Sequence, residues 1–231
     1  MNAPHSIPHT RGLVIHWAAR YDLLAWLFTR GREREFRERI VALARLQRGE
    51  SVLDIGCGTG TLALVATEHI GPTGELHGVD ASPEMIARAR RKAAKANVAA
   101  RFEVAAVENL PFPDGRFDVV LSTLMLHHLP RATRHACARE AARVLKPGGR
   151  MLAVDFVRTQ RKGFLSHFHR HGHVVLEDVM AMFANSGLTV SASGPVIVDR
   201  PSKSGGGGMR DLQFVLAEKR AVDDVSRVVE P

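Results

Sequence analysis

The chain has 231 residues, of which 45% are hydrophobic and 24% charged, with a formal net charge of +8. This length and composition are typical of one large folded domain with a proper core, and they exclude a wholly disordered chain. No apolar run reaches the length that a transmembrane helix needs, and the residues after Met1 lack the apolar core of a signal peptide, so the sequence predicts a cytoplasmic protein.

The basic residues and the cysteines narrow the class of protein further. Lys and Arg number 32 against 24 Asp and Glu, an excess that favours anionic partners, but the arginines are spread over several expected helices. We therefore expect a basic, solvated surface and no specific nucleic-acid site. Cys57 and Cys137 lack the paired spacing of a disulfide framework or a zinc site, which fits a reducing cytosol.

Residues 1–47 predict a helical cap in front of the main domain. Within it, an aromatic helix is indicated by side chains at helical spacing, namely Leu13, Trp17, Tyr21, Leu24 and Phe28. Three roles fit this helix: it covers the core, it closes as a lid over a ligand, or it makes weak contact with a membrane surface. Residues 33–46 predict a second helix with one apolar face. Its other face carries i,i+4 pairs such as Glu33 with Arg37, which we expect in solvent.

The stretch from Val52 to Gly60 predicts a strand, a ligand-binding turn and the start of a helix. An apolar run stops at Gly56, Gly58 and Gly60, which lack Cβ atoms and let the backbone pass close to a ligand. By itself such a turn is also compatible with a structural bend or with a nicotinamide or flavin site. Twenty residues after Gly60, a second apolar run ends in Asp80, an acid that a strand end directs at a ribose diol.

The rest of the chain alternates between helices and strands. Helices are expected at 62–70, 83–96, 131–145 and 176–185, and strands at 101–104, 117–122, 151–156, 190–193 and 212–218, with a turn at 146–149. This alternation predicts an α/β fold with a doubly wound, mostly parallel, seven-stranded sheet that binds ligands at the carboxyl ends of its strands. The main domain is expected at 48–220, divided into a cofactor half at 48–156 and an acceptor-side half at 157–220, with a frayed tail at 221–231.

Four motifs in this part of the chain follow one another in a characteristic order. They are V-L-D-I-G-C-G-T-G at 52–60, G-V-D-A-S-P-E-M-I at 78–86, N-L-P-F-P-D-G-R-F-D-V-V at 109–120 and R-V-L-K-P-G-G at 143–149. Over residues 48–156 the chain resembles the class I S-adenosylmethionine-dependent methyltransferases, and among them the ubiquinone/menaquinone-biosynthesis-like (methyltransferase type 11) group. The resemblance displaces the dinucleotide interpretation. It implies a Rossmann-like fold, S-adenosyl-L-methionine as cofactor, S-adenosyl-L-homocysteine as product, and no metal.

The resemblance also implies which residues contact the cofactor. The backbone of the glycine turn approaches the methionine end, and Asp54 orients that turn. Asp80 binds the ribose hydroxyls, and Ala81 and Met85 flank the adenine ring. The implied cofactor-binding residues are Tyr21, Asp54, Gly56, Cys57, Gly58, Gly60, Asp80, Ala81, Met85, Ala106, Val107 and Thr123.

Ala106 is a departure from the family pattern. Family members often carry an acid after the third strand that accepts a hydrogen bond from the adenine amino group, followed by a small residue whose backbone N–H meets the ring. Ala106 cannot accept such a bond, whose loss costs on the order of 1 kcal/mol and weakens binding several-fold. Glu108 is a candidate substitute, and a solvated glutamate is the alternative.

Two groups of histidines are candidates for chemistry. His127 and His128 follow the fourth strand, where the family's loop borders the methyl group, and a neutral imidazole there takes a proton from an acceptor hydroxyl or amine, or else packs and holds the loop. The histidines at 167, 169, 171 and 173 have a spacing that holds a metal if helical, but Gly172 argues against a helix and no cluster of Cys, Asp or Glu lies nearby. We interpret that segment as a loop over the acceptor pocket.

The sequence therefore predicts an enzyme that moves a methyl group by in-line displacement to a small-molecule or lipid-like acceptor, of the quinone type or another. Nucleic-acid or protein methylation is the alternative within enzymes, although no Asn-Pro-Pro-Tyr-like motif of base methylation follows the fourth strand. A non-catalytic regulator that binds S-adenosylmethionine is a further alternative, given Ala106. No pattern in the sequence indicates an oligomeric state.

Overall fold

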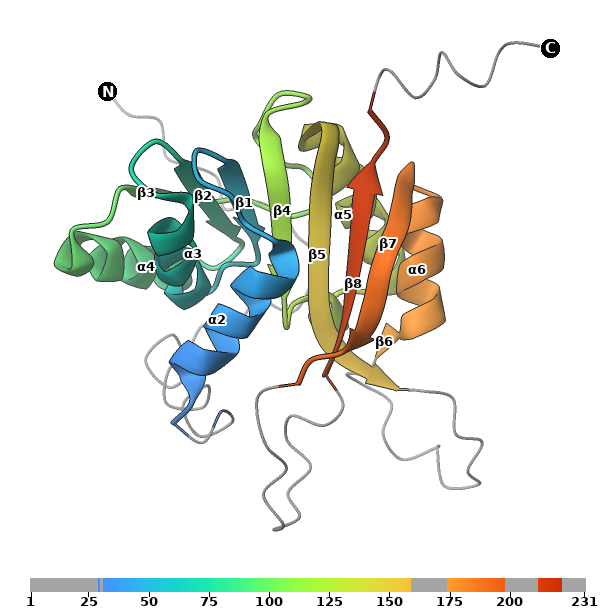
Figure 1. The fold of residues 1–231 in the computed structure, drawn as a ribbon, viewed down its shortest axis with the longest axis horizontal. Helices are drawn as coiled ribbons and strands as arrows, with labels where there is room; N and C mark the ends of the chain where they lie inside the picture. Colours follow the sequence, from blue (N-terminus) through green and yellow to red (C-terminus); the bar gives the residue numbers. More distant parts are fainter. Residues whose placement is uncertain (1–28, 30, 159–173, 198–211, 222–231) are drawn as a thin grey trace.

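The computed structural model describes residue 29 and residues 31–158, 174–197 and 212–221 of the chain (Figure 1). The predicted aromatic helix with Tyr21, the histidine segment 167–173 and most of the predicted tail lie outside these residues. Within the described part of the chain, no helix is both long and apolar enough to span a membrane.

The described residues form one mixed sheet. Its strands are β1 (Ser51–Ile55), β2 (Glu75–Asp80), β3 (Ala100–Val104), β4 (Phe117–Thr123), β5 (Leu145–Arg158), β7 (Leu188–Pro195) and β8 (Leu212–Lys219), in the spatial order β3-β2-β1-β4-β5-β8-β7. The two-residue strand β6 (Val174–Val175) pairs with the end of β5. Only β8 runs antiparallel to its neighbours β5 and β7 in this described sheet. The predicted seven-stranded, mostly parallel sheet is therefore confirmed, with β6 as an addition.

Helices cover both faces of the sheet. The helices α2 (Glu33–Ala44), α3 (Thr61–Ile70) and α4 (Pro83–Ala96) pack on one face, and α5 (Arg131–Val144) and α6 (Leu176–Ala184) pack on the other (Figure 1). Local sequence sets where they begin: the Ser82 hydroxyl accepts a hydrogen bond from the Met85 N–H at 3.3 Å, and Pro83 occupies the first turn of α4. The strand order reverses between β1 and β4, which is where open α/β sheets bind ligands.

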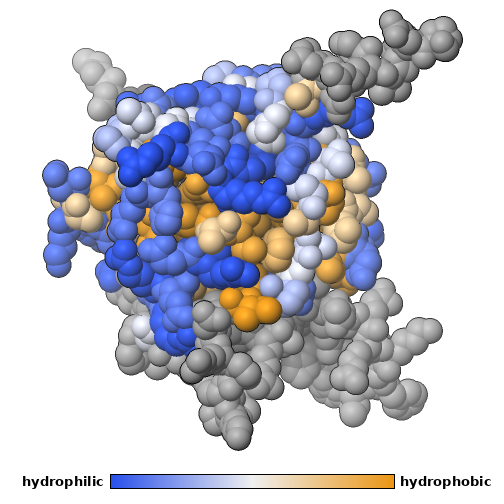
Figure 2. Space-filling view, in the orientation of Figure 1, coloured by the Kyte–Doolittle hydropathy of each residue, from blue (hydrophilic) through white to orange (hydrophobic). Residues whose placement is uncertain are grey.

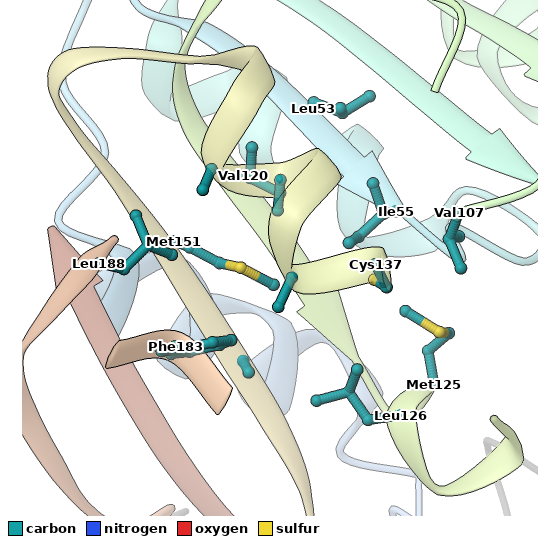
Figure 3. Packing of buried hydrophobic residues seen from close by; sticks show 14 of the residues in the cluster. Leu53, Ile55, Val107, Val120, Met125, Leu126, Cys137, Met151, Phe183 and Leu188 are labelled. Atoms are coloured by element: carbon teal, nitrogen blue, oxygen red, sulfur yellow. The ribbon is translucent and has the colours of Figure 1, made fainter. Parts of the chain in front are cut away.

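Each helical layer encloses its own apolar core. The core under α5 and α6 is drawn in part in Figure 3 and joins side chains from the strands, from these two helices and from the loop after β4, including Ile55, Val120, Met125, Met151, Phe183 and Leu188. The core under α2, α3 and α4 contains Phe36, Ile40, Leu62, Ile86, Phe102 and Leu121. Because both faces of the central strands are buried, their near-continuous apolar runs have a direct structural cause.

One part of the sheet presents an apolar surface. Figure 2 shows apolar residues near the centre of the face drawn in Figure 1, bordered by polar ones. The partly buried side chains of Phe156 on β5, Phe214 on β8 and Ala192 on β7 pack against the core on this face. In β5, Phe156 directly follows Asp155, which is part of the candidate site described below.

The predicted turn at 146–149 is wrong in one respect. Helix α5 ends at Val144, and β5 begins at once, because Leu145 already pairs with Phe117. The ladder resumes with Arg150 opposite Val119, so Lys146-Pro147-Gly148-Gly149 is an irregularity inside a strand. A proline cannot donate to a ladder and Gly148 has φ of 78°, which explains why these four residues leave the regular pairing.

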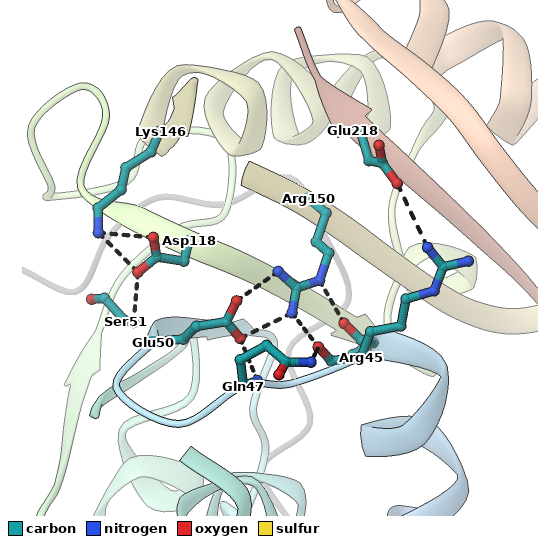
Figure 4. A network of polar contacts seen from close by, with 9 residues as sticks. Arg45, Gln47, Glu50, Ser51, Asp118, Lys146, Arg150 and Glu218 are labelled. Carbon is teal, nitrogen blue, oxygen red and sulfur yellow. Dashed lines mark hydrogen bonds and ion pairs between the residues drawn. The ribbon is translucent and has the colours of Figure 1, made fainter. Parts of the chain in front are cut away.

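A polar network at the amino-terminal ends of the central strands ties α2 to the sheet (Figure 4). The guanidinium of Arg150 on β5 donates to both carboxylate oxygens of Glu50 at 2.7 and 2.9 Å and to the carbonyl oxygens of Ala44 and Arg45, each at 2.6 Å. These carbonyls end α2 and have no partner within the helix. Arg150 therefore caps α2 and holds the helix in a defined position against the sheet.

Candidate active site

The carboxyl ends of four parallel strands meet at one edge of the sheet. Ile55 of β1 pairs with Val79 of β2 and with Ser122 of β4, so the residues that follow each of these lie side by side. Thr123 in turn pairs with Val154 of β5. The register therefore brings Asp54, Asp80, Thr123 and Asp155 to a single edge, although 101 positions separate the first from the last.

Asp80 holds the glycine turn in place. Its Oδ2 accepts a hydrogen bond from the Gly58 N–H at 2.9 Å, and its Oδ1 accepts one from the Ser82 N–H at 2.9 Å. Gly58 has φ of 53°, a left-handed conformation that glycine adopts without strain and that directs this N–H at the carboxylate. Burial raises the pKa of Asp80, while the two N–H donors oppose that rise. Each carboxylate oxygen keeps a lone pair for a ligand hydroxyl.

The other two glycines of the turn make room for neighbouring side chains. A Cβ atom on Gly56 would overlap the Met125 side chain, and one on Gly60 would lie 2.9 Å from the Ala89 Cβ. The absence of side chains at these two positions is therefore explained by packing against the loop after β4 and against α4. Their predicted role as backbone contacts of a ligand stays a prediction.

Between α2 and the glycine turn lies a pocket whose walls carry buried polar groups without partners. The described lining residues are Arg37, Asp54, Gly56, Cys57, Thr59, Thr61, Leu62 and Thr123. Asp54 Oδ2, Thr123 Oγ1 and Arg37 Nε are buried and have no hydrogen-bond partner. Buried polar atoms are normally hydrogen-bonded, so three such atoms in one pocket are what a site for a polar ligand requires.

Burial governs both Asp54 and Arg37 in this pocket. Burial raises the pKa of Asp54 to about 7, and the charge of Arg37 acts against this rise. The expectation that Arg37 faces solvent is wrong: the residue is only 7% exposed, because α2 lies with this side chain turned toward the glycine turn. Its contact with Glu33 exists but is long, at 3.4 Å. No sequence signal separates a buried arginine from a solvated one on a charged helix face.

The adenine-side candidates gather beside Asp80. The Ala105 N–H donates to the Asp80 carbonyl oxygen at 3.1 Å, which brings the segment after β3 next to the end of β2. Met85, Ala106 and Val107 are 2%, 5% and 6% exposed, so their apolar side chains are buried. The Ala106 side chain supplies no hydrogen-bond acceptor. The roles of these residues and of Ala81 stay predictions.

His127 and an acid that the sequence analysis missed form a closely bonded pair. The 3₁₀ turn η1 (Leu126–His128) places His127 Nδ1 2.6 Å from Asp155 Oδ1, and the other oxygen of Asp155 accepts the His127 backbone N–H at 3.1 Å. Asp155 is only 3% exposed. The signal that could have identified it is an acid inside the apolar run 151–156, since a buried carboxylate needs a partner.

His128 lies against His127 but differs from it in environment. The two ring centroids are 3.9 Å apart. Burial and the neighbouring charge of His127 lower the pKa of His128 to about 4, so its imidazole is neutral at physiological pH. Its position favours the packing role that was the alternative for the histidine pair. Tyr21 lies outside the described residues, and no cluster of three metal-binding side chains occurs in the part of the chain that the structure describes.

The strand order and the strand-end site define the class I methyltransferase fold, and comparison with known proteins agrees. Residues 52–149 match the family model described as a methyltransferase domain. The chain is 41% identical over 139 residues to the demethylmenaquinone methyltransferase of Thermus thermophilus, covering 60% of this chain and 62% of that protein. It is 37% identical over 141 residues to a ubiquinone/menaquinone biosynthesis C-methyltransferase of Azotobacter vinelandii, covering 60% and 55%.

A solved structure shares the fold at low sequence identity. The crystal structure of an S-adenosylmethionine-dependent methyltransferase from Aquifex aeolicus superimposes with a TM-score of 0.67 and 19% identity, covering 87% of this chain and 97% of that one. The chain therefore matches a methyltransferase domain over residues 52–149 and has the fold of the class I methyltransferases. Within that class it is related to the ubiquinone and menaquinone biosynthesis methyltransferases, although it spans less than two thirds of the length of the two relatives.

Proposed function

We propose that this protein is an S-adenosylmethionine-dependent methyltransferase whose acceptor is a small, largely apolar molecule of the quinone type. The proposal rests on one observation: the Asp80 carboxylate accepts a hydrogen bond from the Gly58 N–H beside a pocket lined by Asp54 and Thr123. That arrangement combines a carboxylate for a ribose diol with polar groups that lack partners in the protein.

The residues of the crevice fit the parts of this cofactor. Asp80 would bind the ribose hydroxyls, Met85 and Val107 would contact the adenine, and the pocket beside Asp54 would receive the amino-acid end. When bound, S-adenosylmethionine supplies an electrophilic methyl group. The protein then has to orient an acceptor in line with that group, which by itself accounts for much of a rate enhancement.

His127 is the residue that we assign to proton removal from the acceptor. A carboxylate only accepts hydrogen bonds, so Asp155 holds the proton of His127 on Nδ1 and leaves Nε2 as an acceptor. A phenolic hydroxyl or an acidic ring C–H must lose a proton on methylation, and Nε2 is the group that would take it. Asp155 stabilises the imidazolium that this step produces, while neutral His128 adds no competing charge.

The surroundings of His127 favour an apolar acceptor. The Phe156 ring lies 5.4 Å from the His127 ring, centroid to centroid, and is partly buried against the core under α2, α3 and α4. One relative is named as a demethylmenaquinone methyltransferase and the other as a methyltransferase of ubiquinone/menaquinone biosynthesis, and a quinol presents a flat ring with ionisable hydroxyls. An aromatic acceptor with an exchangeable proton matches both the apolar wall and the base.

The test is a labelling experiment with purified protein, methyl-labelled S-adenosylmethionine and either a chemically reduced demethylated naphthoquinone or a cell extract. The proposal expects label in the organic phase with the quinol, and loss of this label in His127→Gln. Label in nucleic acid or protein instead would overturn the proposed acceptor in favour of a macromolecular substrate. Binding of S-adenosylhomocysteine with no label in any fraction would favour the non-catalytic alternative.

A further inference from the structure

Arg134 lies in the first turn of α5, on the side of the helix that faces the sheet. The residues four and seven positions after it, Ala138 and Ala141, are fully buried in the core under α5 and α6, and such spacings share one helix face. Long helical side chains lean toward the helix N-terminus. Because α5 follows β4, that N-terminus lies at the carboxyl edge of the sheet, so the Arg134 side chain is directed toward the candidate site.

The Arg134 guanidinium is bonded to the loop that carries His127 through Nε alone. Nε donates to the Leu129 carbonyl oxygen at 2.9 Å, and Leu129 directly follows η1. Among the described residues, Nη1 and Nη2 make neither a hydrogen bond nor an ion pair. The guanidinium is partly buried, and its remaining N–H donors are available to a ligand.

The negative charges around Arg134 belong to the site. Burial lowers the pKa of Arg134, and the charges of Asp155 on β5 and Asp178 on α6 oppose this effect. Asp155 alternates along β5 with Leu152 and Val154 of the opposite face, so its side chain lies on the face that α5 covers. In the part of the chain that the structure describes, neither acid forms an ion pair with Arg134, and Asp178 is exposed.

Removal of a proton from an acceptor hydroxyl creates two charges, and one of them lacks a partner so far. When Nε2 of His127 takes the proton, the O–H bond breaks and its electron pair stays on the acceptor oxygen. Asp155 stabilises the imidazolium that results. A guanidinium suits the oxyanion, because it is always protonated and donates strong, charge-assisted hydrogen bonds to oxygen.

We propose that Arg134 binds the oxyanion of the acceptor, and that the site therefore selects aromatic acceptors with an acidic hydroxyl conjugated to the atom that receives the methyl group. A phenol or quinol that reacts as its anion meets this requirement, whereas a ring whose oxygen is already alkylated does not. The inference rests on the proposed function, because it concerns the acceptor of that reaction.

The experiment compares two ligands that bind to the protein in the presence of S-adenosylhomocysteine. The hydroxyl of 1-naphthol ionises with a change in absorbance, and 1-methoxynaphthalene has the same ring without that proton. In the wild-type protein we expect the naphtholate anion to bind at least about tenfold more tightly than neutral 1-naphthol, the range for a charge-assisted hydrogen bond. Arg134→Met should abolish this preference and leave 1-methoxynaphthalene unchanged within about twofold.

Three further variants sharpen the comparison. Arg134→Lys should keep part of the preference for the anion, because it keeps the charge. Arg131→Met, an exposed arginine in the same turn of α5, is the matched control and should keep all of it. His127→Gln should also keep it, since Arg134 remains. A preference that disappears in His127→Gln and persists in Arg134→Met would overturn the assignment.

Turnover provides a readout that a purely structural role would not change. With a reduced demethylated naphthoquinone, Arg134→Met should lower kcat/KM at least about tenfold at neutral pH, and the loss should shrink as pH rises, because the solvent then deprotonates the acceptor. The groups next to Arg134 that also titrate are His127, His128, Asp155 and Asp178, and all remain in the variant. A loss that is equal at every pH would contradict the inference.

The outcomes separate the inference from the proposed function. If the wild-type protein does not bind S-adenosylhomocysteine, the proposed function falls and the inference with it. If it binds S-adenosylhomocysteine but neither naphthalene, the aromatic acceptor and the inference are overturned, and the methyltransferase assignment is not. If Arg134→Met weakens both naphthalenes equally, or weakens neither, only the assignment of Arg134 is overturned.

Discussion

The Nδ1 atom of His127, in the loop after β4, lies 2.6 Å from Oδ1 of Asp155 at the end of β5. The carboxylate also accepts the backbone N–H groups of His127, at 3.1 Å, and of Phe156, at 2.7 Å. Three hydrogen bonds thus fix the direction of the imidazole. Since η1 contacts β5 directly, the orientation of the proposed base is set by the sheet.

A first prediction concerns this pair. Asp155→Asn and His127→Gln should each lower kcat about 100-fold or more, the usual contribution of a positioned base, with binding of S-adenosylhomocysteine unchanged within about twofold. The measurement is steady-state methylation beside calorimetric binding. His69→Gln is the control and should keep full activity, because His69 is a half-exposed histidine on α3 that pairs with Glu38 of α2. Equal loss of binding and turnover would assign the pair a structural role.

A second prediction concerns Asp80. Asp80→Ala removes the acceptor of the Gly58 N–H together with the proposed ribose contact, so affinity for adenosine-containing ligands should fall at least about tenfold. Because adenosine itself carries the ribose, 5′-methylthioadenosine and S-adenosylhomocysteine should weaken in parallel. Unchanged affinity for both ligands would contradict the ribose role.

A third prediction follows from the buried carboxyl of Asp54, whose pKa rises from 3.8 to about 7. Between pH 4 and 7 the folded protein holds this proton while the unfolded chain does not, so the free energy of unfolding falls as pH rises through that window. The penalty above pH 7 is about 4 kcal/mol at about 1.4 kcal/mol per pKa unit. Asp54→Asn should therefore be the more stable protein at pH 8 and should approach wild type at pH 4.

Denaturant titrations of wild type and variant across this pH range measure the difference. The groups that act on Asp54 are Arg37 and Asp80, and both remain in the variant. Asp118→Asn provides a control of opposite sign, because Lys146 and the Ser51 N–H hold the pKa of Asp118 below its usual range. That variant should be less stable than wild type at neutral pH, and the difference in the free energy of unfolding should shrink as pH falls. The prediction would be contradicted if the difference in the free energy of unfolding between wild type and Asp54→Asn did not change with pH.

A fourth prediction concerns the clamp on α2. Arg150→Met removes the cation that pairs with the Glu50 carboxylate and the donor of the Ala44 carbonyl, while Gln47 still donates to Glu50 Oε2 and to the Arg45 carbonyl; a loss of about 2–4 kcal/mol in the free energy of unfolding is expected. Arg91→Met, an exposed arginine on α4, should change stability by less than about 0.5 kcal/mol.

The sequence by itself determined the strands, the glycine turn and the class of fold. Apolar runs ending at Gly56 and Asp80 mark the ends of β1 and β2, and the alternation of elements leads to the doubly wound sheet that the structure contains. These features are local, because a run of apolar residues, a glycine with positive φ or a Ser-Pro helix start acts within a few residues.

Only the tertiary structure decided which charged residues enter the site. Arg37 carries the same sequence signal as its solvated neighbours, and the way α2 sits on the sheet is what buries it. Asp155 reaches His127 across 28 positions because β4 and β5 pair in parallel and end at the same edge. Such contacts depend on strand register and helix rotation, which arise from packing of the whole domain and leave no periodic trace in the sequence.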